Sequence, residues 1–167
     1  NAENYMEYVG DIRESGGHLL EVLNDILDMS KIEAGEIQLD EETFHIGNEI
    51  TRSLRFVNEK VMRKKISLAV ELDEPSMMLY ADQRVFKQIF LNLFSNALKF
   101  TDDYGKISVS VRYSKDRSIE LCVEDSGIGI SEDDIPKVMM PFGQVQASHA
   151  RNFEGTGLGL SLVKNFA

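Results

Sequence analysis

The sequence has little cysteine, little positive charge and no long apolar run. Cys122 is the only cysteine among the 167 residues, so no disulfide can form within the chain, and its strand-like surroundings favour a buried, unreactive thiol. Lysine and arginine total 18 against 28 acidic residues. This deficit argues against non-specific nucleic-acid binding, which needs a basic face. No apolar run reaches the length of a membrane span, and residues 1–11 lack the pattern of a signal peptide.

What is present suits an ordinary globular protein, with 43% hydrophobic and 28% charged residues. The length allows one domain with a real core and room for an appendage. A protein with a formal net charge of −10 can still bind an anionic nucleotide where a metal ion, backbone N–H groups and a few cations act locally. The chain opens on Asn1 rather than methionine, which suggests a piece of a longer protein.

Residues 4–31 are expected to form one long helix. Ile12, Leu19 and Ile26 recur every seven residues, which is typical of a helix that packs in a bundle or coiled coil rather than on a sheet. The helix should end at Gly35, because glycine is the usual helix terminator.

Residues 37–42 form an acidic connector, which we take as the boundary between residues 1–40 and residues 41–167. Beyond it, alternating apolar residues predict strands and longer amphipathic stretches predict helices. The predicted strands are residues 44–46, 66–72, 77–80, 106–113 and 118–124, and the predicted helices are residues 88–101, residues 158–167 and a stretch that ends near residue 63. This order predicts an α/β sandwich with helices on one face of a mixed sheet.

The central predicted helix, residues 88–101, carries an unusual row of polar side chains. Asn92, Asn96 and Lys99 fall at positions i, i+4 and i+7, which places them on one side of the helix. Two amides and an ammonium group in an otherwise apolar helix suit a site for a metal ion and phosphate oxygens. The alternative is a surface helix with incidental asparagines. Asp82 is expected to cap the helix, and its apolar stripe should face the core with Ile89, Leu93, Phe94, Ala97 and Leu98.

A first glycine segment, DSGIG, follows the last predicted strand. Gly127 and Gly129 allow the backbone to turn tightly and approach a ligand, and Asp125 can accept a hydrogen bond from an exocyclic amine. By itself this pattern is more typical of an ordinary turn.

A second glycine segment, GTGLGL, spans residues 155–160 and opens the last predicted helix. Glycines at a helix start expose unpaired N–H groups, which favour phosphate binding. The segment is neither a dinucleotide fingerprint, since the spacing is wrong and no strand precedes it, nor a P-loop, since no Gly-Lys-Ser/Thr follows. Residues 143–154 before it are polar and carry Arg151, a composition typical of a mobile lid over a ligand, with Pro141 and Phe142 as its hinge or anchor.

In this order and spacing, residues 92–101, 125–129, 141–142 and 155–160 resemble the sensor histidine kinases of two-component systems. Residues 5–35 look like the second helix of that family's dimerisation domain. The resemblance covers nearly the whole chain. Each motif alone is ambiguous, but four in order with the correct spacing are strongly specific.

The resemblance implies a Bergerat-type ATP-binding fold, a two-layer sandwich of helices on a mixed sheet, preceded by one long bundle helix. It implies that Asn96 coordinates Mg²⁺, that Asn92 supports the metal and phosphate site, and that Lys99 contacts phosphate. The residues that would bind ATP are Asp125, Gly127, Gly129, Arg151, Gly155, Thr156, Gly157, Leu158 and Gly159. Asp125 would pair with the adenine amine, and the glycines of the second segment would bring N–H groups to the phosphates.

The implied activity is transfer of the γ-phosphoryl group of ATP to a protein histidine. Relatives of this fold that hydrolyse ATP carry a glutamate one turn before the metal-binding asparagine, where this chain has Asn92. An amide cannot act as a general base, so transfer is favoured over hydrolysis.

Three departures from the family pattern matter. The chain lacks the family's phosphoacceptor segment around a histidine, so the acceptor should lie upstream of Asn1; His18, on the second bundle helix, is more typical of a structural residue. The chain stops at Ala167, where the family continues with further strands, so the ATP-binding domain is expected to be C-terminally truncated. Met140 replaces the acidic residue that usually precedes Pro-Phe.

The expected partners are a second copy of the chain, through the bundle helix, and a response regulator receiver domain or phosphotransfer protein. We expect no nucleic acid and no membrane contact within this fragment. Its expected location is the cytoplasm, and whether the parent protein has a membrane anchor stays open. Two rival interpretations remain: a non-catalytic pseudokinase of the same fold, and a freestanding ATPase, which Asn92 and the bundle helix disfavour.

Overall fold

The computed structural model describes residues 2–116, 118–145 and 155–167. Its elements, in chain order, are α1 (Ala2–Ala34), β1 (Glu41–His45), α2 (Ile46–Arg63), β2 (Ser67–Leu72), β3 (Met78–Asp82), α3 (Gln83–Phe100), β4 (Lys106–Tyr113), β5 (Ile119–Asp125), α4 (Ile135–Val138) and α5 (Gly159–Phe166). The predicted strands and long helices are confirmed, with ends displaced by a few residues. The short helix α4 was not predicted, because four residues carry too little periodicity to reveal a helix.

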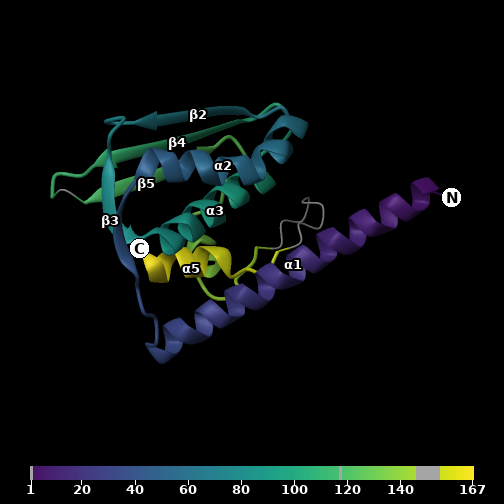
Figure 1. Ribbon diagram of the computed structural model, residues 1–167, viewed down its shortest axis with the longest axis horizontal. Coiled ribbons are helices and arrows are strands. Elements are labelled where there is room, and N and C mark those ends of the chain that lie inside the picture. Colours follow the sequence, from purple (N-terminus) through teal and green to yellow (C-terminus); the bar gives the residue numbers. More distant parts are fainter. Residues whose placement is uncertain (1, 117, 146–154) are drawn as a thin grey trace.

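Two sheets frame the molecule. β2 pairs in parallel with β4, and β4 pairs antiparallel with β5, which makes a three-stranded mixed sheet. β1 and β3 pair antiparallel in a second, two-stranded sheet. In Figure 1, α2 and α3 lie along one face of the three-stranded sheet, and α5 lies on the side of α3 away from that sheet. The predicted α/β arrangement of helices on a mixed sheet is therefore confirmed.

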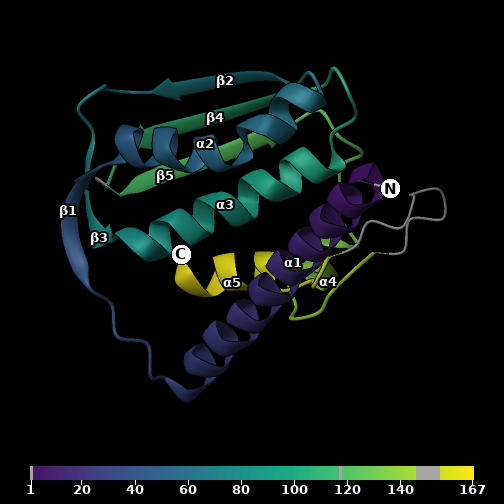
Figure 2. The ribbon, with the colours of Figure 1, turned by 45° about the vertical axis from the view of Figure 1, so that its right-hand side comes forward.

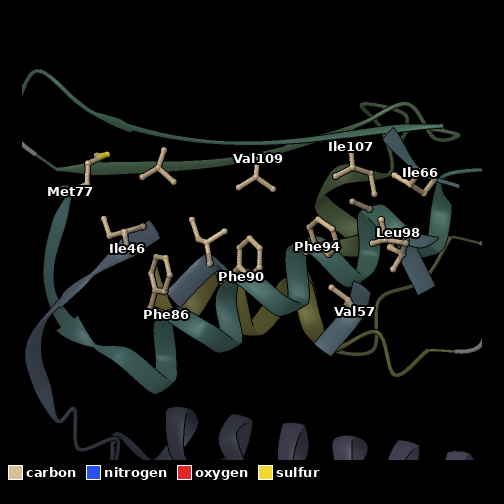
Figure 3. Close-up of a cluster of buried hydrophobic side chains, with 14 of the residues drawn as sticks. Ile46, Val57, Ile66, Met77, Phe86, Phe90, Phe94, Leu98, Ile107 and Val109 are labelled. Carbon is tan, nitrogen blue, oxygen red and sulfur yellow. The ribbon is translucent and has the colours of Figure 1, made fainter. Parts of the chain in front are cut away.

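The core lies between α3 and the three-stranded sheet (Figure 3). Alternate residues of β4 point toward the helices, and Val109 and Val111 are fully buried. Phe90 and Phe94 of α3 oppose them with no exposed surface, and their rings stack with centroids 5.7 Å apart. Burial of such a side chain contributes about 1.5–3 kcal/mol. The core therefore fixes which side of α3 faces the sheet.

The predicted apolar stripe of α3 was partly wrong. Phe86 and Phe90 are buried, whereas Ile89 and Leu93 are only half-buried. The helix has the sheet on one side and α5 on the other (Figure 1). A helix covered on two sides carries apolar residues over most of its circumference, so its periodicity does not select one face.

Asp82 caps α3 as predicted. Its Oδ1 atom accepts hydrogen bonds from the backbone N–H groups of Arg84, at 2.8 Å, and Val85, at 3.3 Å. The Arg84 guanidinium donates to Oδ2 at 2.7 Å, and this charged partner holds the pKa of the buried Asp82 carboxyl well below its usual range. The start of α3 is thus held by a cap that stays ionised at neutral pH.

The long helix α1 ends as predicted at Gly35, which has a φ of +66°. The N–H of Glu36 donates to the Lys31 carbonyl at 2.9 Å, and the N–H of Gly35 donates to the Ile32 carbonyl at 3.0 Å, the two bonds of a Schellman motif. Figure 2 shows α1 crossing α5, with its N-terminal end beyond α5. Many of its large apolar side chains are exposed: Tyr5, Tyr8, Val9, Ile12, Leu19, Leu20, Leu23, Ile26 and Leu27. Among the residues that the structure describes, no helix is both long and apolar enough to cross a membrane.

Candidate functional site

The polar row of α3 lies beside the start of α5. Asn92, Asn96 and Lys99 are all half-buried, and their spacing of four and three residues keeps them on one side of the helix. The Asn92 amide donates a long hydrogen bond, 3.4 Å, to the Gly159 carbonyl. The row therefore faces the backbone of the second glycine segment.

The backbone of the second glycine segment comes close to the polar row at both of its ends. A Cβ atom built on Gly155 would lie 2.7 Å from the Lys99 Nζ, and one built on Gly159 would lie 3.5 Å from the Asn92 Cγ. Asn96 lies between Asn92 and Lys99, one helical turn from the first. The segment thus approaches both ends of the polar row, at Asn92 and at Lys99.

Gly157 is held by a neighbouring loop rather than by α3. Its φ is +71°, and a Cβ atom on it would lie 2.8 Å from the carbonyl carbon of Phe142. The Gln144 side chain donates to the Gly155 carbonyl at 2.6 Å. The predicted Pro141-Phe142 anchor therefore contacts the segment through its backbone.

Thr156 and Leu158 serve the segment's own geometry. The Leu158 side chain is fully buried, and its N–H donates to the Thr156 Oγ1 at 3.2 Å, which tightens the turn into α5. The Thr156 hydroxyl in turn donates to the Asp25 carboxylate of α1 at 3.5 Å. Leu158 is thus a core residue by its side chain, and only its backbone faces the turn.

The first glycine segment meets the C-terminal end of the same helix. Asp125 is the last residue of β5 and pairs with the buried Ile107, so it lies on the sheet face that the helices cover. Its Oδ1 accepts from the Gly127 N–H at 2.8 Å, which closes an Asx turn. A Cβ atom on Gly127 would overlap the Phe100 carbonyl oxygen, whereas Gly129, with a φ of +68°, has open space beside it.

Both glycine segments therefore contact α3, one at its C-terminal end and the other along its polar row. The predicted site residue Arg151 lies outside the described residues. Two surface hollows of about 730 and 720 Å³ lie at the other end of α3, around Asp82 and Arg84. Within the described part of the chain, neither hollow is lined by a predicted site residue.

Sequence reasoning missed three participants: the Asp25 carboxylate, the Gln144 amide and the Phe100 carbonyl. Each acts on a residue far away in the chain or through the backbone. No local pattern could have signalled them, because periodicity and motif spacing report only short-range order.

Residues 81–167 match the protein-family model described as "Histidine kinase-, DNA gyrase B-, and HSP90-like ATPase". The chain belongs to this ATPase family. The match covers all the predicted site residues, from Asn92 to Gly159.

Named relatives place this ATPase domain among the histidine kinases. The chain is 42% identical over 161 residues to an uncharacterised sensor-like histidine kinase of Rhizobium meliloti, covering 96% of this chain and 30% of the relative. It is 40% identical over 166 residues to the histidine protein kinase DivJ of Caulobacter vibrioides, covering 99% of this chain and 28% of DivJ. The resemblance to a sensor histidine kinase catalytic domain is confirmed, and nothing in these comparisons favours the pseudokinase alternative. The chain spans less than a third of either relative.

Two solved structures share this histidine kinase fold. The full-length protein ShkA, crystallised in complex with AMPPNP, superposes with a TM-score of 0.80 at 28% identity, covering 96% of this chain and 33% of ShkA. The histidine kinase ThkA, solved in complex with the response regulator TrrA, gives a TM-score of 0.65 at 25% identity, covering 85% of this chain and 41% of that one.

Proposed function

We propose that this domain binds Mg²⁺–ATP between α3 and the two glycine segments, and that the intact protein transfers the γ-phosphoryl group to a histidine outside residues 1–167. The observation that carries the proposal is the contact of both glycine segments with α3, at Phe100 for the first and at Asn92 and Lys99 for the second. The AMPPNP complex of ShkA supports a nucleotide as the ligand.

The residues present fit a magnesium–nucleotide ligand. Mg²⁺ prefers oxygen donors and commonly takes most of them from substrate phosphates and water. In the part of the chain that the structure describes, no three His, Cys, Asp or Glu side chains gather into a metal site. The Asn96 amide oxygen would supply one protein ligand beside phosphate oxygens and water. When bound, Mg²⁺ would neutralise phosphate charge.

The chain's own groups would bind and orient the nucleotide. A carboxylate has about four acceptor positions, and one of those on Asp125 is used by Gly127. The remaining positions suit the adenine amine. The Lys99 ammonium and the N–H groups of Gly155 and Gly157 would hold the phosphates. Catalysis by such a domain consists of positioning and charge neutralisation, since the acceptor histidine supplies the attacking nitrogen.

Asn92 argues for transfer rather than hydrolysis. Its amide donates to the Gly159 carbonyl and cannot take a proton from water. We therefore expect the purified domain to bind ATP and to hydrolyse it slowly. Fast Mg²⁺-dependent hydrolysis that disappears in an Asn96→Ala variant would refute this part of the proposal.

Calorimetry with AMPPNP and Mg²⁺ tests the binding site. Asn96→Ala should remove the magnesium-dependent part of the binding free energy, because the substitution deletes the amide oxygen. The matched control is Asn58→Ala on the exposed side of α2, which should bind as the unmodified protein does. Absence of binding by the unmodified protein, or equal binding by the Asn96 variant, would overturn the site.

The exposed apolar residues of α1 support a bundle with a second copy of the protein. Ile12 and Leu19 are 71% and 60% exposed, and a contiguous row of exposed apolar side chains is typical of a protein–protein interface. We propose that residues 1–40 belong to a dimerisation bundle, that residues 41–167 belong to the ATP-binding domain, and that a response regulator is the downstream partner in the cytoplasm. The ThkA–TrrA complex supports the last of these. A monomer by sedimentation of the intact protein would contradict the dimer.

A further inference from the structure

The ammonium group of Lys64 lies at the C-terminal end of α3. Lys64 follows the last residue of α2, and its Nζ donates to the carbonyl oxygens of Thr101 at 2.7 Å and Leu98 at 2.8 Å. A third, longer bond of 3.4 Å reaches the Lys99 carbonyl. One half-buried side chain thus joins α2 to the end of the site helix, more than thirty residues further along the chain.

These bonds satisfy groups that a helix end leaves unpaired. The last four carbonyls of an α-helix have no partner within the helix. The Ala97 carbonyl accepts from the Thr101 N–H at 3.0 Å, and Lys64 supplies donors to the carbonyls that follow. An ammonium group has three donors, and its positive charge complements the negative end of the helix dipole.

The same last turn carries the groups proposed to meet the nucleotide. The Lys99 side chain faces Gly155, and the Phe100 carbonyl packs against Gly127 of the first glycine segment. Thr101 is 1% exposed, so the surrounding residues leave the backbone of this turn little room to move. A displacement of this backbone would move Lys99 and the Asp125–Gly129 turn together.

We propose that Lys64 is a positioning residue for nucleotide binding, which fixes the path of the last turn of α3 without touching the nucleotide. The inference rests on the proposed ATP site. The backbone of Lys64 is itself held in place, because its carbonyl accepts a hydrogen bond from the Tyr104 N–H at 2.8 Å. Lys64 therefore connects the loop after α2, the loop before β4 and the end of α3 at one point.

The adjacent Lys65 provides a matched control. Its Nζ donates to the Tyr104 hydroxyl at 2.9 Å on the exposed side of the same loop. Lys64→Met keeps the length and apolar stem of the side chain but removes its donors, and it should weaken AMPPNP binding about tenfold. Lys65→Met should change that affinity by no more than about twofold. Lys64→Arg should recover most of the loss, because a guanidinium is also charged and offers several donors.

Calorimetric affinity and thermal unfolding are measured on each variant at a temperature where circular dichroism shows it folded. A purely structural lysine would lower the unfolding temperature and leave the affinity of the folded protein unchanged, and that result overturns the inference. If the Lys64→Met variant does not fold, Lys64→Gln is measured in its place. A loss of AMPPNP affinity smaller than about twofold in that variant also overturns the inference. Failure of the unmodified protein to bind AMPPNP would instead refute the proposed ATP site, so the two failures are distinguishable.

Discussion

Gly157 offers the sharpest test of the backbone geometry in the second glycine segment. Its φ of +71° lies in the left-handed region, and a Cβ atom would approach the Phe142 carbonyl carbon to 2.8 Å and the Gly143 carbonyl oxygen to 3.1 Å. Gly157→Ala therefore combines an unfavourable dihedral with an overlap against backbone atoms. Backbone atoms cannot rotate away as a side chain can, so the segment itself must shift.

The magnitude follows from the dihedral alone. A left-handed conformation costs an L-residue about 1–2 kcal/mol relative to glycine. The nucleotide-free protein can relieve this strain by moving the segment away from Phe142, and nucleotide binding must then restore the original path. AMPPNP affinity should therefore fall by a factor of about 5–30, with the overlap adding to that loss.

Gly35→Ala is the control for Gly157→Ala. Gly35 has a nearly equal φ of +66°, no atom within 4 Å of a built Cβ, and a place at the end of α1 away from the glycine segments. Calorimetry with AMPPNP should show a loss for the Gly157 variant only, while both variants lose some thermal stability. Unchanged affinity in Gly157→Ala, or an equal loss in Gly35→Ala, would refute the reasoning.

Two further predictions concern stability. Phe90→Ala should lower the free energy of unfolding by about 3–5 kcal/mol, because it opens a cavity around a fully buried side chain. Urea denaturation measures this free energy, and a loss below about 1 kcal/mol would contradict the observed packing. Asp82→Asn keeps a capping oxygen but removes the charge bound by Arg84. Folding depresses the pKa of Asp82 below its ordinary value of 3.8. The ionised carboxylate therefore stabilises the fold fully at pH values above 3.8, and this contribution is lost as the pH falls toward the pKa of the folded state. The stability difference between the Asp82→Asn variant and the unmodified protein should therefore shrink in acid, and a pH-independent difference would argue against the ion pair.

Local sequence was enough for much of this protein. The Asn92–Lys99 row, the Asp82 cap and the termination of α1 at Gly35 each depend on residues within one or two helical turns, where spacing maps directly onto geometry. The glycine segments were visible for the same reason, since only glycine leaves the backbone open to a neighbour. These features also carried the family resemblance.

Tertiary structure decided what those segments touch. That Phe90 rather than Ile89 is fully buried depends on which side of α3 packs against the three-stranded sheet. The bonds from Lys64 to the end of α3, from Thr156 to Asp25 and from Gln144 to Gly155 join parts of the chain that no motif connects. The local sequence pattern determines whether a segment forms a helix, a strand or a turn. Which other segment it packs against is decided only when the whole chain folds, because all apolar faces then compete for the same buried surface.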